Sequence, residues 1–153
     1  QQGQNQNSEL HLPAILEFVE ALKLCEKLRE KETARLTKLR DYFIAQLLKI
    51  PNTVLNGSAS ARIPNNINVS FLGADSEYVV LALDAKGVAC SSGSACSARS
   101  ESASYVLKSL GADDTRANSA VRFTIARDTT KADLNYVLKI LPPILTRARK
   151  YQG

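Results

Sequence analysis

The stretch that decides the fold is Asn66-Ile67-Asn68-Val69-Ser70-Phe71. Its three apolar residues alternate with three polar ones, which is the pattern of a β-strand with one buried face and one open face. Residues 120–126 repeat this alternation with Val121, Phe123 and Ile125 as the apolar set. The sequence therefore predicts two strands of one sheet, with a hydrophobic core against a single face.

Helical patterns flank these strands on both sides. Apolar residues recur at helical spacing from Leu12, weaken through a charged run, and resume from Leu36 to Leu47. This predicts one long helix that ends before Pro51, or two helices that join between residues 30 and 33. Shorter helices are expected over residues 76–83 and 101–110. Thr130 and Asp133 have the spacing of a capping box that opens a last helix.

The remaining segments are predicted to be short strands and loops. Residues 53–55 and 88–90 are expected to be short strands, and residues 113–118 a polar loop. Pro142-Pro143 should kink the last helix or split it, because proline has no N–H to donate.

These elements give an α/β fold of α+β type. We expect a small sheet of three or four mostly antiparallel strands, covered on one face by helices, with a long N-terminal helix. Residues 1–10 are expected to be a flexible polar leader, and residues 11–153 the domain. The predicted core residues are Ile67, Val69, Phe71, Leu81, Leu107, Val121, Phe123, Ile125, Leu138 and Leu141.

Composition excludes several classes of protein. With 44% hydrophobic and 23% charged residues, the chain can bury a core. The net charge of +5 is interspersed and aromatic residues make up only 6%, so a nucleic-acid partner is not expected. No apolar run is long enough for a membrane span. Three cysteines and His11 lack zinc spacing, so no metal site is expected. The odd cysteine count without a secretory signal indicates the cytoplasm.

Cys96 carries the strongest local signal for chemistry. It lies in Ser91-Ser92-Gly93-Ser94-Ala95-Cys96-Ser97-Ala98-Arg99-Ser100, where almost every residue is small. Such a loop leaves a thiol accessible, and the following helix N-terminus would favour the thiolate. The alternative is a small buried cysteine in a tight turn. Residues 91–100 are expected to be mobile, because no large apolar side chain anchors them.

At this stretch the chain resembles the cysteine desulfurases, pyridoxal-phosphate enzymes of the class V aminotransferase group. Further matching motifs lie on both sides and extend the resemblance over residues 12–150. They are Arg62 to Phe71 (RIPNNINVSF), Leu81 to Asp84 with Gly87-Val88, Ser104 to Leu107 with Leu110-Gly111, Val121-Arg122-Phe123, and Arg127 with Thr129-Thr130.

The resemblance implies roles for two residues. Cys96 corresponds to the nucleophile that attacks the sulfur of L-cysteine, which leaves alanine and a persulfide on the enzyme. Arg122 corresponds to the arginine that binds the substrate carboxylate; the alternative is a strand arginine that faces solvent. Cys25 and Cys90 are interpreted as small core residues, and His11 as a surface residue.

The resemblance also implies that this chain is the carboxy-terminal small domain of a fold-type I enzyme. The family's large domain supplies the lysine and the other groups that hold pyridoxal phosphate, and those motifs are missing here. The chain alone is therefore expected to bind no cofactor and to be inactive.

The expected partners are that large domain, a sulfur-acceptor or scaffold protein in pathways such as iron–sulfur cluster assembly, and a second copy of the chain. Self-association would use the apolar stripe of Leu12, Ile15, Leu16, Val19 and Leu22; alternatively, the stripe covers the domain's own sheet. The competing functional interpretation is a stand-alone persulfide carrier or interaction module without pyridoxal-phosphate chemistry.

Overall fold

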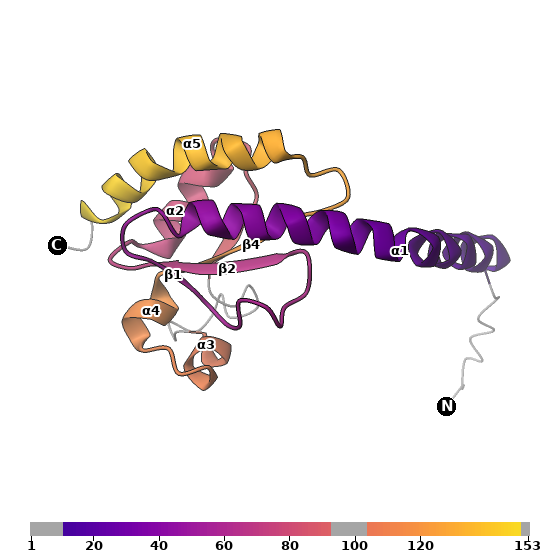
Figure 1. The fold of residues 1–153 in the computed structure, drawn as a ribbon, viewed down its shortest axis with the longest axis horizontal. Helices are drawn as coiled ribbons and strands as arrows, with labels where there is room; N and C mark the ends of the chain where they lie inside the picture. The colour runs from indigo at the N-terminus through magenta and orange to yellow at the C-terminus, as the bar shows by residue number, and fades with distance from the viewer. Residues whose placement is uncertain (1–10, 93–103, 151–153) are drawn as a thin grey trace, which may run out of the picture. The chain divides into compact units, whose positions relative to one another are not determined.

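The computed structural model of the chain describes residues 11–92 and 104–150 (Figure 1). Its elements are α1 (Leu12–Leu47), β1 (Thr53–Leu55), β2 (Asn66–Phe71), α2 (Ser76–Asp84), β3 (Ser91–Ser92), α3 (Tyr105–Ser109), α4 (Asp114–Asn118), β4 (Ala120–Thr124) and α5 (Lys131–Ala148). The strands form one antiparallel sheet in the order β1-β2-β4-β3. The predicted fold class is confirmed.

The chain divides into two compact units, Gln1–Thr33 and Ala34–Gly153. The first contains the N-terminal part of α1, whose apolar side chains Leu12, Ile15, Leu16, Val19 and Leu22 are exposed. The second contains the C-terminal part of α1 and every other element. No helix in the described ranges combines the length and apolarity that a membrane crossing requires.

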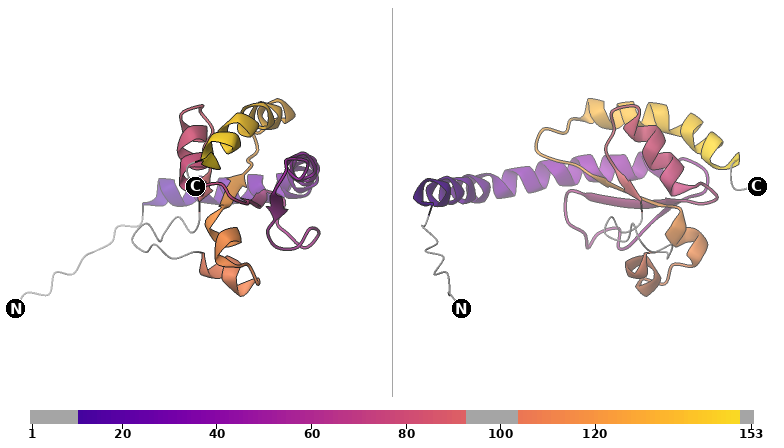
Figure 2. Two further views of the ribbon diagram at one scale, coloured as in Figure 1. Left: turned by 90° about the vertical axis from the view of Figure 1, so that its left-hand side faces the viewer. Right: turned by 180° about the vertical axis from the view of Figure 1, so that it is seen from behind.

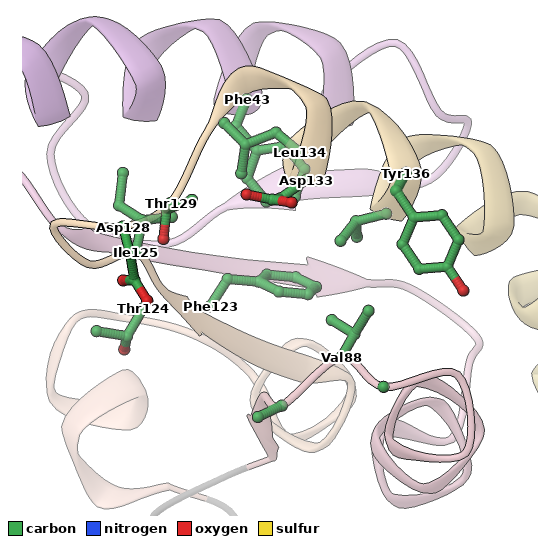
Figure 3. Close-up of a pocket in the computed structure, with 13 residues that line it drawn as sticks. Phe43, Val88, Phe123, Thr124, Ile125, Asp128, Thr129, Asp133, Leu134 and Tyr136 are labelled. Atoms are coloured by element: carbon green, nitrogen blue, oxygen red, sulfur yellow. The ribbon is translucent and has the colours of Figure 1, made fainter.

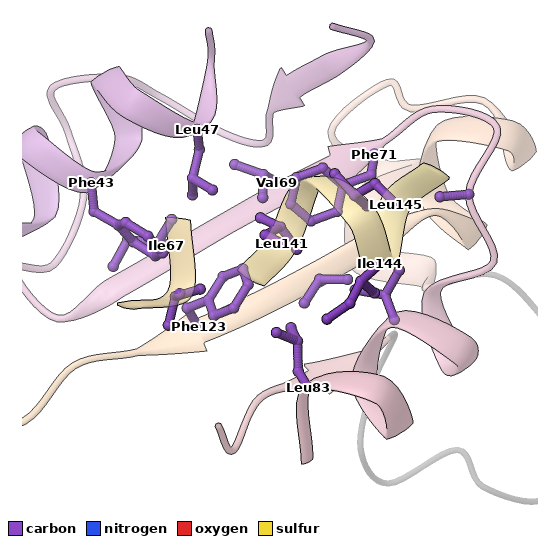
Figure 4. Close-up of a cluster of buried hydrophobic side chains, with 14 of the residues drawn as sticks. Phe43, Leu47, Ile67, Val69, Phe71, Leu83, Phe123, Leu141, Ile144 and Leu145 are labelled. Carbon is purple, nitrogen blue, oxygen red and sulfur yellow. The ribbon is translucent and has the colours of Figure 1, made fainter. Parts of the chain in front are cut away.

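One face of the sheet carries the hydrophobic core of the second unit. The register pairs Ile67 with Phe123 and Val69 with Val121, so apolar side chains from both central strands point the same way. Residues 34–47 of α1, together with α2 and α5, supply the side chains that pack on this face (Figure 4). Phe43 meets Phe123 edge to face, with ring centroids 5.4 Å apart.

Helix α5 runs without a break through Pro142 and Pro143. The sequence predicted a kink or a split there, and the split is wrong. Both prolines lie on the exposed side of the helix, where carbonyl groups that lose an N–H partner can bind water. Leu141 and Leu145, nearly fully buried, hold the same turns against the sheet. The predicted capping box between Thr130 and Asp133 is confirmed.

Three other local predictions are wrong. Residues 114–118 form α4 and not a loop, because the Asp113 side chain accepts a hydrogen bond from the Arg116 N–H and caps the helix. The strand expected at residues 88–90 lies at Ser91–Ser92. Leu81 is 69% exposed, whereas Val79 and Leu83 of the same helix are buried. Helix α2 therefore carries more apolar residues than its buried side can accommodate.

Two short helices lie on the opposite side of the sheet from α2 and α5 (Figure 2). These are α3 and α4, whose Leu107 and Ala117 form a small second cluster with Ala120 of β4. The second face of the sheet is therefore covered at one end.

Candidate functional site

The second face of the sheet is polar, and the described residues of the chain cover only part of it. At the end beneath α3 and α4, Ser70 and Ala120 are buried at 0% and 2% exposure. Toward the other end, the same face presents Asn68 and Arg122, both half-buried, and Thr124, which is exposed. This part of the face, with Asn66 beside Thr124, is the open polar face.

One row of residues crosses the open polar face from strand to strand. Asn56 follows β1 and donates its backbone N–H to the carbonyl of Asn68 at 2.9 Å. Asn68 is the ladder partner of Arg122, and Arg122 is the partner of Ser91 in β3. Side chains opposite each other in neighbouring strands lie about 5 Å apart at Cβ. The sheet therefore places Asn56, Asn68, Arg122 and Ser91 side by side.

Arg122 is the cation of this row. Within residues 11–92 and 104–150, its side chain takes part in no hydrogen bond and no ion pair, so its donors are available to a ligand. A guanidinium presents parallel N–H groups that match the two oxygens of a carboxylate. The predicted position of Arg122 on a strand is confirmed, and its predicted role as a carboxylate ligand stays a prediction.

A hydrogen-bonded network lies beside Arg122 at the covered end. The Arg116 guanidinium donates from Nε to Asn56 Oδ1 at 2.7 Å and from Nη2 to the Leu55 carbonyl at 2.8 Å. Asn56 Nδ2 donates to Asn68 Oδ1 and to Ser70 Oγ, each at 2.8 Å. Ser70 Oγ donates to the Arg116 carbonyl at 2.6 Å. Leu55 and Arg116 lie 61 positions apart, and no pattern in the sequence indicated the network.

Cys96, the predicted nucleophile, lies outside the described residues. The stretch that contains it begins directly after Ser92, the ladder partner of Val121. Of the stretch predicted to be mobile, only Ser91 and Ser92 are described, and they form β3. The connection between β3 and α3 therefore starts next to Arg122.

The other cysteines and His11 do not join the open polar face. Cys25 is exposed on α1, which contradicts its interpretation as a core residue; a cysteine on the apolar side of a helix is buried only where that side is packed. Cys90 is half-buried and packs against the core, as predicted. Burial, with a smaller effect of Asp84, raises the pKa of the Cys90 thiol to about 11, so this thiol is protonated at neutral pH and reacts slowly there. His11 is exposed, as predicted.

A pocket of about 350 Å³ lies on the helix-covered side of the sheet (Figure 3). Its lining includes Phe43, Phe123, Asp128 and Tyr136. Because Phe123 and Arg122 are neighbours in one strand, their side chains point to opposite faces. Thr124 of the open polar face also lines the pocket, so the pocket and that face meet at this residue, whereas Arg122 is not part of the lining.

The described residues do not fit pyridoxal phosphate on their own. A site for this cofactor needs a lysine at its centre. Every lysine of the described ranges is exposed and lies on a helix or near its end, and none stands on the open polar face. The same ranges hold no group of three histidine, cysteine, aspartate or glutamate residues that could bind a metal ion.

Comparisons with known proteins agree on one family. Residues 6–137 match the family model described as aminotransferase class-V. The cysteine desulfurase IscS of Dictyoglomus turgidum is 42% identical over 140 residues, which are 91% of this chain and 36% of that protein. Cysteine desulfurase IscS 1 of Archaeoglobus fulgidus is 37% identical over 149 residues, which are 97% of this chain and 39% of that protein.

A mitochondrial relative and a solved structure extend this result. The mitochondrial cysteine desulfurase of Eremothecium gossypii is 41% identical over 84% of this chain and 26% of its own length. A structure described as a NifS-like protein superimposes with a TM-score of 0.77 at 20% identity, over 90% of this chain and 34% of that one. The chain thus spans between 26% and 39% of the length of these curated relatives.

Proposed function

The chain belongs to the aminotransferase class-V family, and on this premise we propose that it is the part of a cysteine desulfurase that binds the substrate carboxylate and receives the sulfur. The net reaction converts L-cysteine and the thiol of Cys96 into L-alanine and a Cys96 persulfide. One carbon–sulfur bond breaks, one sulfur–sulfur bond forms, and no outside oxidant or reductant is needed.

The observation that carries this proposal is the placement of Arg122. Its guanidinium, which bonds to no residue of the described ranges, stands on the open polar face, opposite Ser91, and the chain that leaves β3 leads to Cys96 four residues after Ser92. Four extended residues span at most about 14 Å. A substrate whose carboxylate binds Arg122 is therefore within reach of a thiol carried by this connection.

Cys96 is the proposed nucleophile and persulfide carrier. A thiol attacks as its thiolate, and it must be accessible for that reaction. Cys90, with its raised pKa and partial burial, is unsuited to this task, and Cys25 lies in none of the motifs that carry the family resemblance. Cys96 is thus the cysteine that lies in the family's motif and in the segment that leaves β3 next to Arg122.

Pyridoxal phosphate is proposed to be held by residues that this chain does not contain. In the complete family this cofactor supplies the electron sink for breaking the carbon–sulfur bond. The open polar face has no lysine, so the chain by itself is proposed to bind no pyridoxal phosphate and to release no alanine. Its partners are a cofactor-binding large domain and a cytoplasmic sulfur acceptor or scaffold protein, for example one in iron–sulfur cluster assembly.

A persulfide carrier is the second candidate function. It is favoured by the combination of a Cys96 motif with a face that lacks the cofactor lysine. A carrier would take sulfur from a separate donor and pass it on without acting on L-cysteine. In either case a second copy of the chain is a proposed partner of the exposed stripe of α1.

A chimaera tests the first candidate. The matching 36% of the Dictyoglomus turgidum IscS is replaced by this chain, and alanine formation from L-cysteine is measured. We expect an active chimaera in which Cys96→Ser abolishes turnover and Arg122→Lys raises KM at least about tenfold, while the matched control Cys90→Ser is unchanged. A folded, cofactor-loaded chimaera that is inactive, or that keeps turnover as Cys96→Ser, would contradict the proposal.

The isolated chain separates the two candidates. It is incubated with glutathione persulfide, and with L-cysteine plus pyridoxal phosphate, and then weighed by mass spectrometry. A gain of one sulfur atom from glutathione persulfide that Cys96→Ser removes supports Cys96 as an acceptor. If this gain accompanies an inactive chimaera, the chain is a carrier and the desulfurase assignment is wrong.

A further inference from the structure

Arg116 fixes the orientation of the Asn56 side-chain amide, because the Arg116 side chain can only donate hydrogen bonds. Arg116 has only donors on its side chain. Its Nε–H donates to the side chain of Asn56 at 2.7 Å, so the group of Asn56 that faces Arg116 must be the oxygen. The nitrogen of Asn56 is thereby turned to the other side.

This constraint passes from Asn56 to Asn68. The Asn56 nitrogen lies 2.8 Å from the side chain of Asn68, so Asn68 must present its own oxygen there. The second N–H of Asn56 is used by Ser70, which donates in turn to the Arg116 carbonyl. Every member of the network has one consistent role, and Asn68 cannot rotate its amide without placing two donors against each other.

The nitrogen of Asn68 is consequently directed away from Asn56. In the row across the sheet, Asn56 and Arg122 flank Asn68 on opposite sides. Asn68 is half-buried, and its two side-chain N–H groups donate to no residue of the described ranges. The amide therefore offers donors next to the guanidinium of Arg122.

We propose that Asn68 is a second carboxylate-binding residue, whose side-chain N–H donates to the same substrate carboxylate that Arg122 binds. This rests on the proposed function, because it takes the carboxylate site at Arg122 as given. Arg122 supplies charge and two parallel hydrogen bonds, and Asn68 adds a donor from the neighbouring strand. Three donors from two strands orient the carboxylate more strictly than one flexible arginine can.

The test uses the 153-residue chain and acetate as the probe. Acetate is titrated at constant ionic strength and about pH 6, where it is ionised, while NMR follows the side-chain N–H signals of Asn68 and the Nε–H of Arg122. We expect both sets of signals to shift along one saturation curve. Shifts of Arg122 alone would overturn the role of Asn68 and leave the proposed function intact. If neither set shifts, the carboxylate site fails, and both proposals fall.

Variants separate donation by Asn68 from general charge. Asn68→Asp keeps an oxygen for Asn56 but removes the donor, and should weaken acetate binding at least about tenfold, the loss expected for a hydrogen bond to a charged group. The matched control Asn66→Asp adds the same charge to the same face, opposite Thr124, and should weaken binding less than about threefold. Equal losses in the two variants would overturn the proposal.

A third variant tests the orientation itself. The carboxylate introduced by Asn56→Asp still accepts from Arg116 but has no N–H for Asn68, so the Asn68 amide should turn its nitrogen toward this carboxylate. We expect a loss of acetate affinity and a large shift of the Asn68 N–H signals without added acetate. Unchanged Asn68 signals in a folded Asn56→Asp protein would show that Asn56 does not set this orientation.

Discussion

Removal of the Asn56 side chain is the sharpest test of how the covered end of the polar face is held together. Asn56 is 5% exposed, and its amide makes three hydrogen bonds, one of them with the Arg116 guanidinium. At about 1 kcal/mol for each neutral bond and about 2 kcal/mol for the charged one, the sum is about 4 kcal/mol. Arg116 and Asn68 are half-buried and regain part of this from water. We therefore expect Asn56→Ala to lower the free energy of unfolding by about 2–3 kcal/mol.

The assay is urea unfolding of the chain followed by circular dichroism, with linear extrapolation to water. The matched control is Asn66→Ala, which removes an amide from the same face of the sheet, where no hydrogen bond within the described ranges uses it. Its effect on the free energy of unfolding should stay within about 0.5 kcal/mol. A loss below about 1 kcal/mol in Asn56→Ala, or one equal to that of the control, would refute the network as a stabilising unit.

Three further outcomes are expected from the same chain. Alkylation of Cys90 by iodoacetamide should be slow near neutral pH and rise until about pH 11, because burial and Asp84 hold its pKa there; a rate that levels off below about pH 9 would contradict this. The hydrogen bonds from Thr130 lower the pKa of Asp133 below its ordinary 3.8, so the carboxylate stabilises the fold above that pH and loses its effect as the pH falls through the lowered value. The melting point of Asp133→Asn should accordingly lie below that of the parent chain at neutral pH and converge with it in stronger acid. A difference in melting point that stays constant with pH would contradict this role of the Asp133 carboxylate. Leu16→Glu should change the free energy of unfolding by less than about 1 kcal/mol, because Leu16 is 58% exposed. The substitution should also reduce any self-association seen by sedimentation at high concentration. Equal self-association of the parent chain and the variant would show that the apolar stripe of α1 is not the contact.

The strands and the core could be predicted from the sequence because period-two alternation is strong in this chain. Ile67, Val69 and Phe71 face the helices as the pattern indicated, and so do Val121 and Phe123. Burial of helix residues was harder to predict, because an apolar residue on a helix indicates only that some surface should cover it. Leu81 and Cys25 are exposed for this reason.

The candidate site was accessible from the sequence only where a motif marked it. Arg122 was found through its resemblance to a family motif, and the strand pattern placed it on the face opposite the core. Asn56, Asn68 and Arg116 were missed, because hydrogen bonds between residues far apart in the chain leave no local periodicity. The short helix at Asp114–Asn118, which brings Arg116 to Asn56, was itself mistaken for a loop.

Because side chains alternate along β2, the residues on the core face determine which residues lie on the polar face. Asn66, Asn68 and Ser70 point to the polar face of the sheet only because Ile67, Val69 and Phe71 point to the core. Deletion of one residue within this strand would exchange the two sets and direct three polar side chains into the core. Changes of length are therefore confined to the turns around β2, and the row beside Arg122 can diversify only by substitution, one side chain at a time.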